Sequence, residues 1–76
     1  MLTPGQCRAA RGFLRWSLKE LSHRAKVSIV TISRFEAEQA SPIPATRQVL
    51  QRAFEDAGIV FADSDVGEVV ELRRKG

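Results

Sequence analysis

The side chains of this chain that could recognise another molecule are mostly cations, and they are concentrated in its first half. Residues 1–35 contain seven Lys and Arg and one Glu, a net charge of +6, whereas residues 36–76 contain five Lys and Arg and eight Asp and Glu, a net charge of −3. Such an asymmetry is typical of a surface that meets phosphate groups. The alternative is that these charges only keep helix faces hydrated.

Residue types that perform covalent or metal chemistry are scarce. The chain has one histidine, His23, one cysteine, Cys7, and no tyrosine, and no Cys and His spacing suggests a zinc site. Gly-rich phosphate loops are absent as well. We expect His23 to be exposed and Cys7 to be a small buried hydrophobe. The protein is therefore not expected to be an enzyme, and no metal site or cofactor is expected.

The length of 76 residues predicts one small domain. A core of this size contributes only about 3 to 5 kcal/mol of net stability, so oligomerisation is a plausible source of further stability. A single cysteine rules out an intrachain disulfide, and no segment of the sequence resembles a signal peptide or an apolar run of roughly 18 residues. We therefore expect no membrane contact and a cytoplasmic location in a bacterium or phage, associated with the nucleoid.

Local start and stop signals predict four helices in the first 58 residues. Three hydroxyl side chains stand where N-caps are expected: Thr3, Ser17 and Ser28. Gln6 and Glu20 follow the first two of them at capping-box spacing. Pro44 suits the first position of a fourth helix, which Gly58 stops with a left-handed residue. The helices are expected over about 4–14, 18–25, 29–36 and 44–57.

The pattern changes after the fourth helix. Strand formers occupy 59–61, turn residues 63–65 and a valine-rich stretch 66–72, which predicts a short β-hairpin or strand. A two-stranded ribbon is marginal alone, so its apolar side must pack on the helices or pair with a second copy of the chain. We therefore expect a helical domain over 1–58 and a dimerisation element over 59–76. The residues expected at the dimer surface are Phe61, Val66, Val69, Val70 and Leu72.

The second and third helices, joined by a tight turn at Lys26 and Val27, have the layout of a helix-turn-helix. Their spacing predicts that these side chains point inward: Leu18, Leu21, Ala25, Val27, Ile32 and Phe35. The third helix then keeps the following residues for its outer face: Ser28, Ile29, Val30, Thr31, Ser33 and Arg34. The first turn of this helix would enter the major groove of DNA.

A long segment resembles the phage repressor and Cro-like helix-turn-helix proteins, the XRE family: WSLKELSHRAKVSIVTISRFEAEQASP. The resemblance covers about residues 3–58 and is carried by residues that fall in register: Ser17, Glu20, Leu21, Ala25, Val27, Ser28, Thr31, Ile32, Phe35 and Glu36. A looser likeness extends to short regulators of the family that end in a valine-rich strand. The resemblance implies a mainly α, four-helix repressor-like domain with a short C-terminal β-hairpin or strand.

Carried over position by position, the resemblance implies that the third helix contacts base edges. The matching residues are Ser28, Ile29, Val30, Thr31 and Arg34. Arg34 suits guanine O6 and N7 as a bidentate donor, and Thr31 can donate or accept. Ile29 and Val30 would contact thymine methyl groups. The alternative is that one of these two aliphatic side chains packs inward or under a loop.

Phosphate contacts are expected around the third helix, at Arg11, Arg15, Ser17, Lys19, Lys26 and Ser41. Ser17 and Ser41 match positions near the starts of the second and fourth helices, where free N–H groups favour anions. For Arg15 and Lys19 the alternative is hydration alone. The resemblance also implies an ion pair between Arg11 and Glu36 that would orient the third helix and leave the arginine partly free for phosphate.

Two residues depart from the family pattern. Leu18 stands where Gln often touches DNA, so its side chain cannot make that contact and serves as core or dimer surface instead. Lys26 stands where a left-handed Gly is usual, and a Lys in that conformation costs on the order of 1 kcal/mol. Its presence reflects either a phosphate contact or neutral drift.

The expected function is sequence-specific binding of double-stranded DNA by a transcriptional regulator, a repressor. Two copies of so short a helix are needed for useful specificity, so we expect a homodimer on a pseudo-palindromic operator with half-sites about 34 Å apart. No small-molecule effector is evident from the sequence. The alternative function is a protein-interaction module on the same scaffold, such as an antitoxin or an RNA polymerase adaptor, with Ile29 and Val30 as its contact patch.

Overall fold

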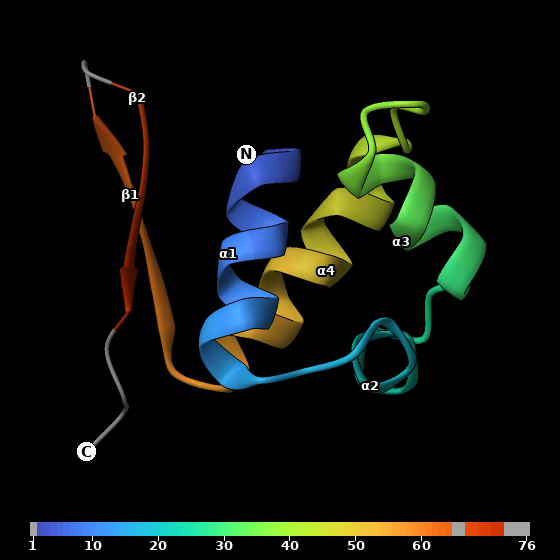
Figure 1. The fold of residues 1–76 in the computed structure, drawn as a ribbon, viewed down its shortest axis with the longest axis horizontal. Helices are drawn as coiled ribbons and strands as arrows, with labels where there is room; N and C mark the ends of the chain where they lie inside the picture. Colours follow the sequence, from blue (N-terminus) through green and yellow to red (C-terminus); the bar gives the residue numbers. More distant parts are fainter. Residues whose placement is uncertain (1, 65–66, 73–76) are drawn as a thin grey trace.

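The computed structural model describes residues 2–64 and 67–72, which form four helices followed by a two-stranded hairpin (Figure 1). The elements are α1 (Pro4–Leu14), α2 (Leu18–Ala25), α3 (Ile29–Glu36), α4 (Pro44–Asp56), β1 (Ile59–Ser64) and β2 (Gly67–Leu72). The predicted mainly helical domain with a C-terminal β segment is confirmed.

Hydroxyl caps begin three of the helices, as predicted. Thr3 Oγ1 accepts a hydrogen bond from Gln6 N at 3.1 Å, and Thr3 N donates to Gln6 Oε1 at 3.0 Å, which completes the capping box of α1. Ser28 Oγ accepts from Thr31 N at 3.1 Å at the start of α3. Each cap satisfies a backbone N–H that the helix itself leaves free, an effect of about 1 kcal/mol.

Only one of the two hydrogen bonds of the capping box predicted at α2 is present, so this prediction was partly wrong. Ser17 Oγ accepts from Glu20 N at 3.0 Å, but Glu20 Oε1 accepts from Arg24 Nε at 2.9 Å instead of from the Ser17 N–H. An arginine one turn later offers a charge-assisted hydrogen bond that a neutral N–H does not. The start of α4 also differs from the others, because its N-cap is Ile43, which makes no side-chain cap.

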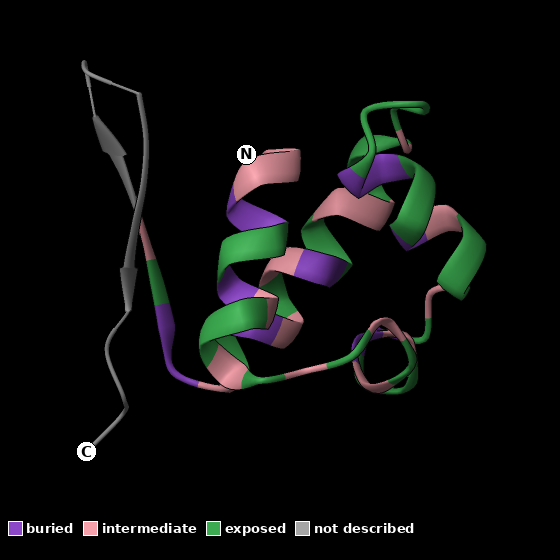
Figure 2. Ribbon diagram, viewed as in Figure 1, coloured by how far each residue is buried: buried purple, intermediate pink, exposed green. Residues whose placement is uncertain are grey.

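The core lies where the helices meet the first residue of β1 (Figure 2). Its buried apolar side chains are Leu2, Cys7, Ala10, Leu21, Ala25, Ile32, Phe35, Leu50, Phe54 and Ile59. Leu18 and Val27 are half-buried and pack against this cluster. The inward positions predicted for the second and third helices are therefore confirmed. Burial of each large side chain contributes about 1.5 to 3 kcal/mol.

The hairpin packs on the helical part of the protomer. β1 and β2 are antiparallel, with Ile59 opposite Leu72 and Ser64 opposite Gly67, and β2 lies against α1. Gly58 has φ 97°, a left-handed conformation that permits the sharp exit from α4, as predicted. In Figure 1 the hairpin and α3 occupy opposite ends of the long axis, which measures 29 Å.

One residue expected at the dimer surface also packs against the core of its own protomer. Phe61 is half-buried, and its ring meets the Phe54 ring edge-on at a centroid distance of 6.0 Å. The ring is only partly covered by the adjacent core, so its expected role in dimerisation stays a prediction. The backbones of Val69, Val70 and Leu72 lie in β2, and Val66 lies outside the described residues.

None of the helices in the described part of the chain could cross a membrane. The longest, α4, has 13 residues, whereas a membrane span needs about 20 predominantly apolar residues.

Candidate nucleic-acid interface

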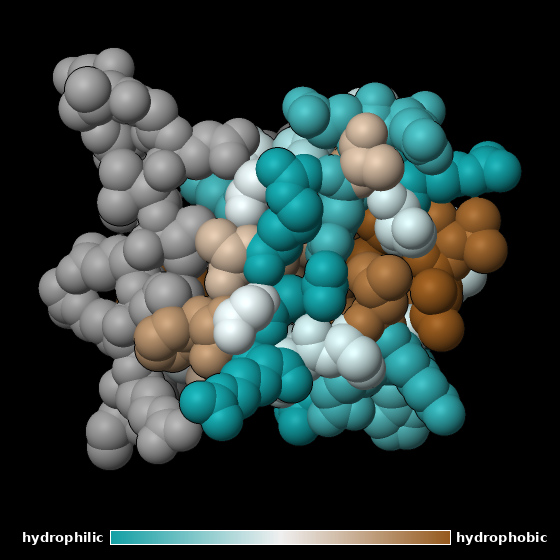
Figure 3. All heavy atoms as spheres, in the orientation of Figure 1, coloured by the Kyte–Doolittle hydropathy of each residue, from teal (hydrophilic) through white to brown (hydrophobic). Residues whose placement is uncertain are grey.

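The first turn of α3 carries two aliphatic side chains on its outer surface. Ile29 is 43% exposed and Val30 is 60% exposed, whereas Ile32 and Phe35 of the same helix are buried. Figure 3 shows apolar side chains gathered at the α3 end of the molecule. The helical period brings Ile32 and Phe35 onto the core and leaves the opposite face to solvent. The alternative that Ile29 or Val30 packs inward is wrong.

Two hydroxyl groups lie beside this aliphatic pair and are bonded to each other. Ser28 Oγ donates to Thr31 Oγ1 at 2.8 Å while accepting from Thr31 N at 3.1 Å. The Ser28 proton is thus used within the cap, whereas the Thr31 hydroxyl keeps its own proton for a donor bond. Ser28 is exposed and Thr31 is half-buried, so this turn presents one hydroxyl donor next to apolar methyl groups.

Arg34 occupies the last turn of α3 and is exposed. Its guanidinium takes part in neither of the two salt bridges formed among the described residues, which are Arg11–Glu36 and Arg24–Glu20. A guanidinium has five N–H donors in a planar fork, a geometry that matches a pair of acceptors such as guanine O6 and N7. The outer face of α3 therefore combines one bidentate cation, one hydroxyl donor and two aliphatic groups.

The C-terminal end of α3 is held against α1 by a buried carboxylate. Arg11 donates to Glu36 through Nε to Oε2 at 2.8 Å and through Nη2 to Oε1 at 2.7 Å, so the ion pair implied by the resemblance is confirmed. Arg11 Nη1 donates to Trp16 O at 3.0 Å, which leaves two of its five N–H groups for another partner. Arg8 donates to the Glu36 carbonyl, and Cys7 Sγ donates to Glu36 Oε2 at 3.2 Å.

These contacts determine the charge of each group in the network. Burial raises the pKa of Glu36, but the hydrogen bonds from Arg11 and Cys7 and the positive charge of Arg11 outweigh it and hold the pKa below its ordinary value of 4.5. Burial, followed by the hydrogen bond to Glu36, raises the pKa of the Cys7 thiol well above its ordinary value. Cys7 is therefore a protonated hydrogen-bond donor, and the expectation that it is buried is confirmed.

Several of the expected phosphate-contact residues surround the start and end of α2. Ser17 is its N-cap and Lys19 is exposed in its first turn. Arg15 ends α1 with φ 57°, and Lys26 ends α2 with φ 58°. The left-handed conformation expected at Lys26 is confirmed, and both cations are exposed.

Ser41 has a different position from the other hydroxyl residues. It is exposed and lies two residues before Ile43, the N-cap of α4, and no side chain caps that helix. The free N–H groups at the start of α4 consequently lack a side-chain oxygen from the N-cap.

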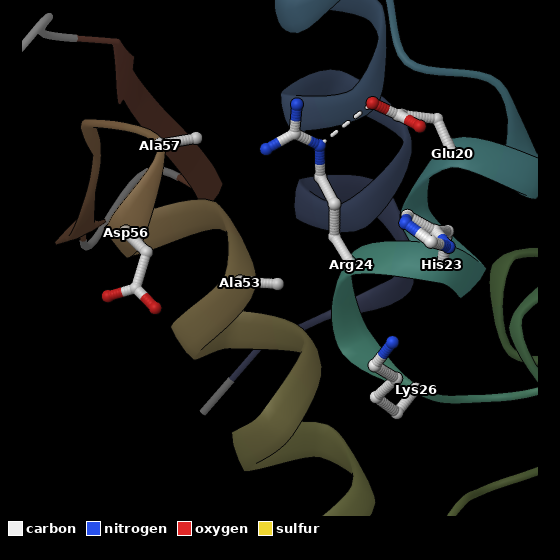
Figure 4. A pocket seen from close by; sticks show the side chains of 7 residues that line it. All are labelled: Glu20, His23, Arg24, Lys26, Ala53, Asp56 and Ala57. Carbon is white, nitrogen blue, oxygen red and sulfur yellow. Dashed lines mark hydrogen bonds and ion pairs between the residues drawn. The ribbon is translucent and has the colours of Figure 1, made fainter.

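An open groove of about 640 Å³ runs between α2 and the end of α4 (Figure 4). The side chains that line it are Glu20, His23, Arg24, Lys26, Ala53, Asp56 and Ala57. Both signs of charge are present, and Glu20 is already paired with Arg24. His23 is exposed, as predicted, and no cluster of metal-ligating side chains occurs within residues 2–64 and 67–72.

An aromatic stack lies beside this groove, and sequence reasoning missed it. The Arg24 guanidinium carbon lies 4.4 Å from the centre of the Trp16 ring, and the Trp16 ring stacks on Phe54 with 5.7 Å between centroids. The stack joins the connection after α1 to α2 and α4. A Trp and an Arg eight positions apart carry no local signal for such a contact, since a chain turn separates them.

No protein-family model matches this chain, and no curated protein sequence is significantly similar to it. The resemblance to the XRE family therefore stays a prediction from the sequence motif.

Proposed function

We propose that this protein is a sequence-specific transcriptional regulator, a repressor of helix-turn-helix type that binds double-stranded DNA as a homodimer. The observation that carries the proposal is the exposure of Ile29 and Val30, 43% and 60%, on the first turn of a short helix at one end of the molecule. Water disfavours such a pair of aliphatic side chains. Thymine methyl groups in a major groove are a suitable partner for them.

The proposed binding mode inserts α3 into the major groove, whose width of about 12 Å accepts an α-helix. Arg34 donates to guanine O6 and N7, Thr31 donates to a base acceptor, and Ile29 and Val30 contact thymine methyl groups. Ser28 lies at the start of the same turn, but it already donates its hydroxyl proton to Thr31, so it does not donate to a base. The Arg11–Glu36 pair supports this mode because it anchors α3 from the side away from DNA.

Phosphate contacts complete the proposed interface. Ser17, Arg15 and Lys19 surround the N-terminus of α2, where the free N–H groups and the helix dipole favour an anion. Lys26 and the exposed Ser41 extend this set of contacts. Arg11 adds the two N–H groups that its hydrogen bonds to Glu36 and Trp16 leave free. The net charge of +6 on residues 1–35 also supports phosphate binding by this part of the chain.

The proposal is tested by selecting binding sites from random duplexes and titrating the protein with the selected and with unrelated DNA. Arg34→Ala should reduce discrimination between the two by about 1 to 3 kcal/mol. Lys19→Ala is the matched control, because loss of a phosphate contact weakens binding to both DNAs alike and reduces the salt slope by about 1. Absence of any preference in the wild-type protein would refute the proposal.

A protein-interaction module is the second candidate, because the exposed Ile29 and Val30 would also suit an apolar groove on a partner protein. Salt dependence separates the two functions. DNA binding weakens steeply as salt rises, since counterions released from phosphates must be recaptured. An apolar protein contact has a much weaker dependence on salt.

A further inference from the structure

The outer face of α4 is left uncovered by the residues that the structure describes. Leu50 and Phe54 turn into the core, and the opposite side of the helix is exposed at positions spaced three and four apart. Those exposed residues are Ala45, Gln48, Val49, Arg52 and Glu55. The side chain of Val49 is 44% exposed in the middle of this helix.

This surface continues onto the first residues of β1. One shallow hollow on α4 and a second one at the start of β1 share the side chain of Glu55. Val60, beside the second hollow, is 42% exposed. We name the surface formed by these residues the α4–β1 face: Ala45, Gln48, Val49, Arg52, Glu55 and Val60.

The α4–β1 face carries one positive and one negative side chain that are not paired with each other. In residues 2–64 and 67–72, Arg52 takes part in no salt bridge, and Glu55 accepts only a 3.3 Å hydrogen bond from Gln51. Arg52 and Glu55 lie three positions apart, almost one helical turn. A two-fold axis that crosses two antiparallel α4 helices midway between positions 52 and 55 would bring Arg52 of each copy opposite Glu55 of the other. The face is complementary in charge to itself.

The dimensions of the protomer favour this face over the hairpin. The hairpin and α3 lie at opposite ends of the 29 Å axis, so a dimer joined end to end through the hairpins would hold its two α3 helices up to twice that length apart. Successive half-sites one helical turn apart need about 34 Å. α4 lies between α3 and the hairpin in Figure 1, so a contact on α4 brings the two α3 helices closer together.

We propose that a second copy of this chain docks on the α4–β1 face, with Arg52 of each copy paired with Glu55 of the other. Val49 and Val60 supply the apolar part of the contact. The spacing argument rests on the proposed function, whereas the charge argument does not. Each dimer contains the Arg52–Glu55 pair twice, so reversing one charge places two like-charged contacts at the interface.

Sedimentation of the full chain without DNA tests the proposal. The wild-type protein should be a dimer, and Arg52→Glu and Glu55→Arg should each raise the dimer Kd by about tenfold or more, since like charges then face each other. The double variant with both changes should restore the dimer. Lys19→Glu, the same charge reversal on α2, should leave the dimer intact. Circular dichroism establishes that each variant is folded.

The outcomes separate this proposal from the proposed function. A monomeric wild-type protein, a single variant that stays dimeric, or a double variant that is not restored would each overturn the interface. Dimerisation through the hairpin, for example, would survive Arg52→Glu. If the wild-type dimer responds to the charge reversals but shows no preference among duplexes, the proposed interface is supported and the DNA-binding proposal is refuted.

Discussion

The guanidinium of Arg11 donates two hydrogen bonds to the carboxylate of Glu36, at 2.8 and 2.7 Å, and so joins the last turn of α1 to the last residue of α3. Glu36 is 6% exposed, and the described part of the chain contains no buried side-chain nitrogen or oxygen without a hydrogen-bond partner. Removal of one partner would leave a buried charge unpaired. The orientation of α3 is therefore coupled to the integrity of this pair.

Glu36→Gln should lower the free energy of unfolding at neutral pH by about 1 to 3 kcal/mol, because the hydrogen bonds from Arg11 lose their charged acceptor. The difference should depend on pH. The pKa of Glu36 is lower in the folded protein than its ordinary value of 4.5, so its charged form stabilises the fold above that value. This stabilisation is lost as the pH falls through the folded-state pKa.

Thermal melts from neutral pH downward test the Glu36 prediction. The curves for the wild type and for Glu36→Gln should converge below about pH 4.5, the ordinary pKa of the carboxyl. Glu38→Gln, at an exposed position in the loop after α3, is the control and should follow the wild type. A difference between wild type and Glu36→Gln that stays constant across this range would contradict the assignment.

Cys7 should react slowly with iodoacetamide in the folded protein at mildly alkaline pH. Its side chain is 0% exposed, and burial together with the hydrogen bond to Glu36 raises the pKa of the thiol, so little thiolate forms. The chain unfolded in urea should react at the rate of a free thiol. Mass spectrometry of timed samples measures both rates, and equal rates would mean that α1 does not protect this residue.

Lys26→Gly should raise Tm by a few degrees, because the residue has φ 58° and ψ 38° and Gly accepts this conformation without strain. Lys26→Ala is the control, since Ala removes the charge but keeps the Cβ atom, and it should not raise Tm. An unchanged or lower Tm for Lys26→Gly would contradict the strain assignment. If the lysine contacts phosphate, both variants should lose DNA affinity equally.

Val30→Ala should change the free energy of unfolding by no more than about 0.5 kcal/mol, because the side chain is 60% exposed. Its effect should appear in DNA binding. Replacing a contacted thymine by uracil in the selected site removes one methyl group and should cost the wild type about 0.8 kcal/mol. The same replacement should cost Val30→Ala less, which a titration of both proteins with both DNAs measures. Equal losses of affinity for both proteins would mean that Val30 does not contact this thymine methyl group.

The helices were predictable from sequence because their boundaries depend on local signals. Thr3, Ser17 and Ser28 cap the helices they precede, and Gly58 ends the fourth with φ 97°. Each of these signals involves groups within one turn of the chain. The outward position of Ile29 followed from periodicity, which depends equally on near neighbours.

The contacts between distant residues were harder to predict. The hydrogen bond from Cys7 to Glu36 joins residues 29 positions apart, and no periodicity or cap indicates it. The Glu20 side chain could satisfy either the Ser17 N–H or Arg24, and only the charge of the guanidinium decided between them. The position of Phe61 against Phe54 depends on how the hairpin lies on the helices, which its own residues do not encode.

The stack of Arg24, Trp16 and Phe54 also has a consequence for spectroscopy. Trp16 is the sole tryptophan and the chain has no tyrosine, so its ultraviolet emission comes from a single indole. The Arg24 guanidinium carbon lies 4.4 Å from the centre of that indole, and the centre of the Phe54 ring lies 5.7 Å from it. Separation of α2 from α4 would change the surroundings of this one fluorophore. Its fluorescence therefore reports on the docking of these helices without an added label.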